Sequence, residues 1–247
     1  MSSYPLLALA AFLAGSMNAV AGGGSFLTFP ALVFSGVPSI IANASSTVAL
    51  FPGSFASAWG YRESFQKVEG VSYRTLLAVS MAGGVTGALL LLTTRQQTFD
   101  RVVPWLLMMA TILFALGSAI TRRLKESVRI PTGALLVMQY LVGIYGGYFG
   151  GAVGILMLAV LSLYGLTDIH AMNAGKTLLV GAMNAVAVVC FVIAGKVWWA
   201  QTLVMLVAAV AGGYAGARVA QRVDPRILRA AITLISIGMT VAFFLRR

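Results

Sequence analysis

The sequence of 247 residues contains few charged residues and very few acidic ones. Charged residues make up 9% of the chain, with 17 Lys and Arg against 6 Asp and Glu, whereas a soluble globular domain contains roughly 25%. Apolar residues make up 60%, and runs near the length of about 20 residues that crosses a bilayer recur from end to end. This composition excludes an ordinary soluble domain and predicts an all-α polytopic membrane protein surrounded by a lipid bilayer.

Cysteine and histidine are nearly absent, which excludes several kinds of site. The single cysteine, Cys190, lies in an apolar run, so no disulfide can form within the chain and the thiol is expected to be filler. One histidine and few carboxylates do not supply a metal cluster. No nucleophile, base and orienting acid recur at one membrane depth. We therefore expect no metal, no cofactor and no enzymatic activity.

The excess of positive charge has a topological explanation. A net charge of +11 would suggest nucleic acid as the partner of a soluble protein, but here the basic residues cluster between apolar segments, as the positive-inside rule describes. If every apolar segment crosses the membrane, twelve of the 17 Lys and Arg lie on one side and five on the other. We expect the richer side to be cytoplasmic and expect no nucleic-acid partner.

The chain repeats itself with an offset near 130 residues. Three pairs of stretches match in the same order: "AVAGGGS" (19–25) with "GYFGGAVG" (147–154), "GVPSIIANASST" (36–47) with "GLTDIHAMNAGKT" (165–177), and "MAGGVTGALL" (81–90) with "VAGGYAGARV" (210–219). Ordered matches of this kind indicate an internal duplication. We predict a first transmembrane repeat at 1–121, a basic connecting loop at 122–131 and a second transmembrane repeat at 132–247.

Each predicted repeat contains five apolar segments. They lie at 5–21, 25–37, 40–61, 72–94 and 102–121 in the first repeat, and at 132–149, 152–166, 171–195, 198–217 and 227–245 in the second. The second segment of each repeat is short for a full crossing and is either a half-helix or a steeply broken span. Five crossings per repeat would make the repeats inverted, as in many secondary transporters. If the short segments do not cross independently, the repeats become parallel.

Two glycine clusters interrupt the apolar sequence at equivalent positions. The residues that begin the short segments are Gly22, Gly23, Gly24 and Ser25 in the first repeat, and Gly150, Gly151 and Gly154 in the second. A helix that begins there exposes backbone N–H groups that, together with the helix dipole, bind anions. Close packing of small residues is the alternative, and both stay open for the triple glycine. For "AGGVTG" and "AGGYAG" we expect packing.

Polar residues follow each short segment at matching positions. "ANASST" supplies Asn43, Ser45, Ser46 and Thr47, and "MNAGKT" supplies Asn173, Lys176 and Thr177. Each is more often structural when taken alone, but their equivalence in two repeats favours a shared pocket. Lys176 either snorkels to an interface or faces the interior as a counter-charge for an anion.

Two titratable residues flank the same turn. Protonation of His170, next to Asp168, would couple transport to pH, although a histidine in a loop usually has no such role. A proton or sodium is the coupling ion that we consider for a transporter of this kind.

The quoted stretches resemble a known family. "AGGGSFLTFPALVFSGVP" followed by a polar helix, and "GIYGGYFGGAVGILMLAVL" with "MNAGKTLL", are similar to the paired signatures of the TauE/SafE family of sulfite-exporter-like membrane proteins. The resemblance covers nearly the whole chain. It implies a multi-pass carrier of the cell inner membrane, with about eight spans, that exports sulfite or organosulfonates. The sequence departs from the pattern at Ala152 and Val153, where more glycine is expected, so the first glycine cluster is the better candidate for anion contact.

These observations lead to one expected function and two alternatives. We expect a secondary transporter that exports a small sulfur-containing anion by alternating access around a midplane site. Backbone amides at the glycine breaks would bind the anionic oxygens, Asn43 and Asn173 would add neutral hydrogen bonds, and Lys176 would balance the charge. The alternatives are an anion-selective channel and a non-transporting membrane subunit. The sequence gives no oligomeric state.

Overall fold

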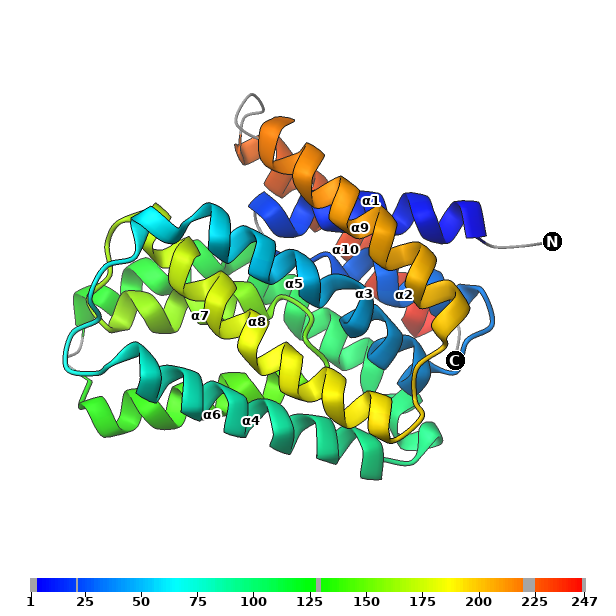
Figure 1. The fold of residues 1–247 in the computed structure, drawn as a ribbon, viewed down its shortest axis with the longest axis horizontal. Coiled ribbons are helices and arrows are strands. Elements are labelled where there is room, and N and C mark those ends of the chain that lie inside the picture. The colour runs from blue at the N-terminus through cyan, green and yellow to red at the C-terminus, as the bar shows by residue number, and fades with distance from the viewer. Residues whose placement is uncertain (1–3, 21, 128–129, 220–224, 246–247) are drawn as a thin grey trace.

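The computed structural model describes residues 4–20, 22–127, 130–219 and 225–245 (Figure 1). The described residues form ten α-helices, one 3-10 helix and no strand, so the prediction of an all-helical chain is confirmed. The helices are α1 (Tyr4–Val20), α2 (Ser25–Phe34), α3 (Ser39–Gly60), α4 (Tyr73–Thr93), α5 (Gln96–Ser127), α6 (Thr132–Tyr148), α7 (Val153–Leu163), α8 (Ile169–Ile193), α9 (Trp199–Val219) and α10 (Pro225–Leu245); the 3-10 helix η1 is Arg62–Ser64.

The ten helices correspond to the ten apolar segments, with one marked difference. The segment predicted at 102–121 is part of α5, which begins at Gln96 and continues to Ser127. The helix therefore runs through most of 122–131, which the sequence reads as a connecting loop. The physical reason is that the Arg, Leu, Lys and Glu residues of this stretch all have high helix propensity. The predicted repeat boundary lies inside a helix.

Two of the helices meet simple criteria for a membrane span. Among the described residues, α4 and α8 are long and apolar enough to cross a membrane by length and composition alone. Helices α2 and α7 contain only 10 and 11 residues, which corresponds to lengths of about 15 Å and 16 Å. This is roughly half of the 30 Å hydrocarbon core of a bilayer.

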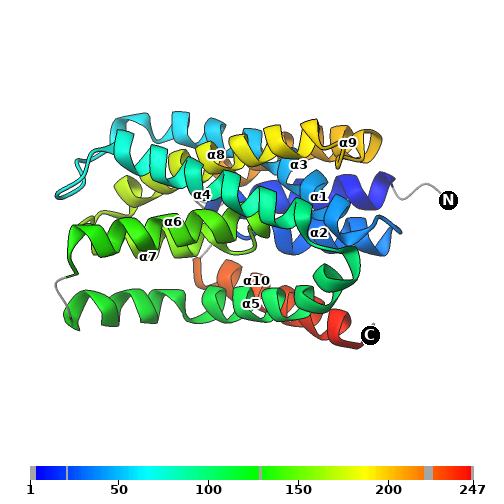
Figure 2. The ribbon, with the colours of Figure 1, turned by 90° about the horizontal axis from the view of Figure 1, so that it is seen from below.

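A sharp turn joins α1 to α2, so that the two helices form a hairpin. Gly22 has φ 77°, a left-handed conformation that glycine adopts without steric cost, and its N–H donates to the carbonyl oxygen of Met17 at 3.1 Å. The N–H of Gly24 donates to Oδ1 of Asn18 at 2.8 Å. The hairpin begins and ends at the same end of the molecule, the right-hand end of both ribbon views (Figures 1 and 2).

Helices α6 and α7 form a second hairpin with the same kind of turn. Gly150 has φ 76°, and its N–H donates to the carbonyl oxygen of Tyr145 at 3.1 Å. The chain then passes through Ala152, whose φ of 58° is the one positive value at a non-glycine residue in the described ranges. This hairpin begins and ends at the opposite end of the molecule from the first (Figures 1 and 2).

Helices α3 and α8 pack against each other and bring the other helices together in pairs. Helix α1 packs on α9, α4 packs on α6, and α5 and α10 form a further layer that contacts α7 and α2 (Figure 2). Glycine makes the tight pairs possible. A Cβ at Gly87 of α4 would meet the carbonyl oxygen of Ile144 in α6, and one at Gly212 of α9 would meet that of Phe12 in α1. The packing interpretation of "AGGVTG" and "AGGYAG" is confirmed at these two positions.

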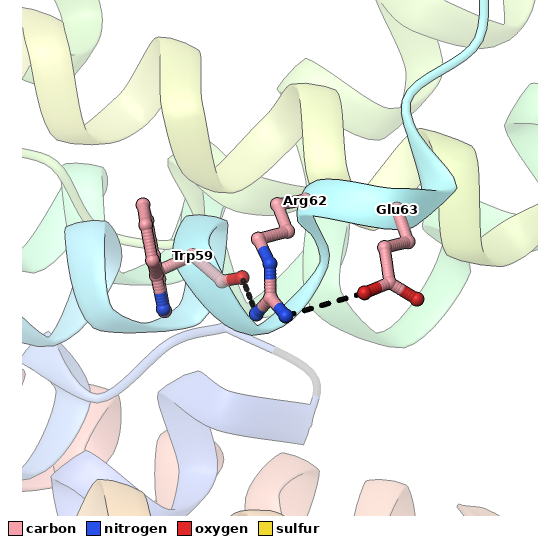
Figure 3. Close-up of polar contacts among 3 residues, drawn as sticks. All are labelled: Trp59, Arg62 and Glu63. Atoms are coloured by element: carbon pink, nitrogen blue, oxygen red, sulfur yellow. Dashed lines mark hydrogen bonds and ion pairs between the residues drawn. The ribbon is translucent and has the colours of Figure 1, made fainter.

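An aromatic and a basic side chain meet where α3 ends (Figure 3). The guanidinium of Arg62 lies 5.2 Å from the ring centroid of Trp59 and donates to the carbonyl oxygen of the same residue at 3.4 Å. It also forms an ion pair with Glu63 at 3.2 Å. A cation at a helix C-terminus satisfies carbonyl groups that have no intrahelical partner.

Candidate functional site

A cavity lies where the tips of the two hairpins meet the central helices. Nine of the fourteen residues that the sequence singled out for anion binding line it: Gly22, Gly23, Ser25, Ser46, Thr47, Gly150, Gly154, Lys176 and Thr177. They come from both halves of the chain and are separated by as many as 155 positions in the sequence. The fold therefore gathers most of the predicted residues around one space.

The two glycine breaks approach each other in this cavity. A Cβ at Gly22 would lie 3.8 Å from the Cα of Gly154. A Cβ at Gly154 would in turn lie 3.4 Å from Cδ of Lys176. The backbone N–H of Gly154 has no acceptor among the described residues. The tips of the two hairpins and the lysine side chain thus meet at one place, and a larger residue at either glycine would narrow it.

Lys176 is the chemically distinctive residue of the cavity. Its side chain is 3% exposed, and Nζ donates to Oδ1 of Asn173 one helical turn earlier at 2.8 Å. No carboxylate forms an ion pair with Lys176 in the described part of the chain. A buried cation without a counter-charge is unfavourable, so the cavity is suited to an anion. The amino group of Lys176 is buried and does not extend to the surface, as the snorkelling alternative would require.

The remaining five predicted residues lie beside the cavity and do not line it. They are Gly24, Asn43, Ser45, Gly151 and Asn173. Nδ2 of Asn43 donates to the carbonyl oxygen of Tyr148 at 3.0 Å and so ties α3 to the end of α6. Asn173 orients the amino group of Lys176. The carbonyl oxygen of Gly151 accepts from the hydroxyl of Tyr145 at 2.5 Å.

Several hydroxyl groups of the site already have partners within the protein. Oγ1 of Thr47 donates to the carbonyl oxygen of Asn43 at 3.0 Å, and Oγ1 of Thr177 donates to that of Asn173 at 2.8 Å. The two threonines therefore make the same bond at matching positions, as hydroxyls in helices commonly do. Ser46 shares a hydrogen bond of 2.6 Å with Thr28 of α2. The protons of the two threonine hydroxyls are therefore engaged, whereas in the bond between Ser46 and Thr28 either hydroxyl can be the donor.

Asp168 and His170 lie at the start of α8 and do not line the cavity. Oδ2 of Asp168 accepts from the N–H of Ala171 at 2.8 Å, which makes Asp168 the N-cap of α8. His170 is exposed, and its ring lies 6.4 Å from that of Tyr61. A role of these two residues in proton coupling stays a prediction.

The cavity is also lined by four polar residues that the sequence analysis had not selected. They are Asn18, Ser54, Ser57 and Asn184. A signal for two of them was present, because Ser54 and Asn184 are separated by the same offset of 130 as Asn43 and Asn173. Each also lies on the cavity-facing side of its helix, seven positions after Thr47 or Thr177. Extending the matched stretches along α3 and α8 would have found this pair.

Comparison with known proteins identifies the family. The sequence model of the family described as "Sulfite exporter TauE/SafE" matches residues 7–243. "Probable membrane transporter protein YfcA" of Escherichia coli (strain K12) is 29% identical over 95% of this chain and 87% of its own length. "Probable membrane transporter protein ORF9" of Sinorhizobium sp is 28% identical over 95% and 90%. A "Probable membrane transporter protein" of Haemophilus influenzae is 25% identical over 93% and 89%.

No solved structure matches the chain. The family match covers both hairpins, both central helices and the cavity between them. The resemblance that the glycine clusters and the polar helices suggested is therefore confirmed, and the chain belongs to the sulfite exporter TauE/SafE family.

Proposed function

We propose that this protein is a secondary transporter that exports a small sulfur-containing anion, such as sulfite or an organosulfonate, across the cell inner membrane. The observation that carries the proposal is the buried amino group of Lys176, which lines the cavity between the two hairpin tips without a carboxylate partner. A bound anion would supply the missing counter-charge. The names of the family and of the three relatives point to membrane transport and agree with this assignment.

The outer surface of the molecule supports its placement in a membrane. Large apolar side chains that would be unfavourable in water are exposed on several helices, among them Ile193 at 81%, Val207 at 68% and Leu6 at 57%. Trp59 and Arg62 at the end of α3 are of the residue types found at membrane interfaces. In this placement six helices, α3 to α5 and α8 to α10, cross the bilayer. The two hairpins enter from opposite faces and return.

The arrangement of the helices supports two inverted repeats, one of α1 to α5 and one of α6 to α10. The first hairpin begins and ends at one end of the molecule and the second at the other (Figures 1 and 2). Helix α1 packs on α9 as α6 packs on α4, and α3 packs on α9 as α8 packs on α4, which is the exchange of partners that a two-fold axis produces. With three crossings and one hairpin, each repeat reverses the orientation of the next.

An inequality between the repeats supports a carrier rather than a channel. A Cβ at Gly53 of α3 would meet no neighbouring atom within 4 Å, and Gly53 lines the cavity. At the equivalent position of α8 stands Met183, which is fully buried and packs against Gly84 and Gly146. The space beside α3 is therefore open and the matching space beside α8 is filled. Alternating access requires two such routes that are not open together.

Flux measurements in proteoliposomes test the proposal. We expect saturable uptake or release of sulfite or a sulfonate by the reconstituted protein, with little flux of chloride. Lys176→Ala and Asn173→Ala are expected to abolish the flux while the protein still inserts and elutes as a folded species. Currents at channel rates without saturation would favour the anion channel. Normal flux in both variants would refute the assignment of the site.

A further inference from the structure

We propose that Asn184 is a specificity-determining residue that binds the end of the transported anion distant from Lys176. This inference rests on the proposed function, because it assumes that an anion occupies the cavity. Asn184 lies on α8 and lines the cavity. It belongs to neither the glycine breaks nor the polar stretch that contains Lys176.

The carboxamide of Asn184 has no partner within the protein. Its Oδ1 atom is buried without a hydrogen bond, and no hydrogen bond joins its Nδ2 atom to another described residue. A buried polar group that lacks a partner is unfavourable, and in a native protein such a group calls for an explanation, such as a bound water or ion. The carboxamide can donate through Nδ2 or accept through Oδ1, so it can bind either an anionic or a cationic substituent.

The distance between Asn184 and Lys176 limits what can touch both. Eight positions along a helix correspond to about 12 Å of axial rise. The amino group of Lys176 is held by Asn173, which lies further from Asn184 along α8. Two hydrogen bonds account for about 6 Å of the span, which leaves roughly 6 Å for the ligand itself. An ion as small as sulfite at Lys176 does not reach Asn184, whereas an anion with a second polar group on a short carbon chain does.

Helix α3 contributes a second polar side chain to the part of the cavity near Asn184. Ser54 of α3 also lines the cavity, and its hydroxyl makes no hydrogen bond to another described residue. The Cβ atom of Ser54 lies close to α8, since a Cβ at Gly181 would be 3.3 Å from it. Ser54 and Asn184 together place two free polar side chains away from the charged end of the cavity, one on each central helix. The cavity therefore has a charged end at Lys176 and a neutral polar end at Asn184.

Binding measurements on the purified protein test this assignment with three ligands. The ligands are sulfite, sulfoacetate and taurine. Sulfoacetate carries a carboxylate one methylene away from its sulfonate, and taurine carries an ammonium group two methylenes away. We expect Asn184→Ala to weaken binding of the two-headed ligand that the wild-type protein binds best by about tenfold, since one hydrogen bond to a charged group is worth about 1.5 kcal/mol. Binding of sulfite should change less than twofold.

A matched variant separates this role from a structural one. Gln201 on α9 also has a buried oxygen without a partner but does not line the cavity, so Gln201→Ala should leave all three affinities unchanged. Because Asn184 makes no hydrogen bond to lose, Asn184→Ala should not lower the melting temperature of the ligand-free protein.

The outcomes distinguish the two proposals. If the wild-type protein binds a two-headed sulfonate and Asn184→Ala binds it equally well, the role of Asn184 is refuted and the proposed transport function stands. Equal weakening of sulfite and sulfonates, or a lower melting temperature without ligand, would also refute it. If the wild-type protein binds no sulfur anion, the proposed function fails and this inference fails with it.

Discussion

Helices α3 and α8 occupy equivalent places in the proposed repeats but contribute differently to the cavity. The register that aligns Asn43 with Asn173 pairs Ser46 with Lys176 and Gly53 with Met183. Helix α8 thus has a positively charged residue and a bulky one at these two positions. Helix α3 has a serine and a glycine there, and the space beside the glycine is open. In the proposed repeats, α8 therefore supplies the charge of the site and α3 supplies the open space beside it.

The largest expected effect comes from the pair that differs in charge. Lys176→Ala should weaken anion binding between about 10-fold and 100-fold, the range for one or two hydrogen bonds to a charged group. Ser46→Ala should change it less than threefold, because its hydroxyl is already bonded to Thr28. Isothermal titration of both variants measures the contrast. Equal losses in the two would show that charge does not distinguish the helices.

Filling the open space beside α3 should block transport. Gly53→Met places in α3 the side chain that α8 already has, at a position where a Cβ meets no atom within 4 Å and which lines the cavity. We expect flux in proteoliposomes to fall at least tenfold, with a melting temperature equal to or above that of the wild type, because methionine favours helix more than glycine does by roughly 0.8 kcal/mol. Unchanged flux would mean that the space beside Gly53 is not part of the pathway.

Removing the bulk beside α8 should instead reduce stability. Met183 is fully buried, so Met183→Ala is expected to lower the free energy of unfolding by about 2–4 kcal/mol through the cavity that it leaves. Gly53→Ala, its matched control, meets open space and should not lower it. Thermal unfolding in detergent measures both. An equal change in the free energy of unfolding for Met183→Ala and Gly53→Ala would contradict the claim that the two positions are packed differently.

The turns of the two hairpins give the smallest contrast. Ala152 has φ 58°, a conformation that costs a residue with a Cβ roughly 1–2 kcal/mol. Ala152→Gly should therefore raise stability by up to about 1 kcal/mol after the greater flexibility of glycine in the unfolded chain is counted. Gly22→Ala, at φ 77°, should lower stability by a similar amount. Thermal unfolding should show a higher melting temperature for Ala152→Gly and a lower one for Gly22→Ala, and a shift in the same direction for both would contradict this prediction.

Much of the architecture follows from local sequence patterns. Apolar runs predicted all ten helices, and the glycine clusters predicted where the two short helices begin, because both signals depend on neighbouring residues. The direction of the chain after each glycine cluster does not follow from local sequence. Whether the chain continues or turns back at Gly22 and Gly150 depends on how the hairpins pack in three dimensions. The charge of the stretch 122–127 predicts a loop, whereas the helix propensity of its residues predicts the helix that the structure contains.

Some residues of the candidate site could likewise be predicted from local sequence, and others could not. Lys176 and the glycines that line the cavity could be selected because charge and glycine runs are rare in an apolar sequence. The hydrogen bond from the amide of Asn43 to the carbonyl oxygen of Tyr148 could not be predicted, because Tyr148 lies more than 100 positions away in the sequence. Ser54 and Asn184 are single polar residues, which in a membrane helix are most often structural, and only their shared offset of 130 pointed to them.

The most direct test of the account is the thermal stability of the purified protein in the presence of sulfite, thiosulfate, sulfate, taurine, sulfoacetate and chloride. A ligand at 100 times its dissociation constant that binds only the folded state stabilises it by about 2.7 kcal/mol. We predict that one sulfur anion raises the melting temperature selectively and that Lys176→Ala removes the increase. A uniform response to all six compounds, or an increase that persists in Lys176→Ala, would contradict the claim that this cavity is an anion site.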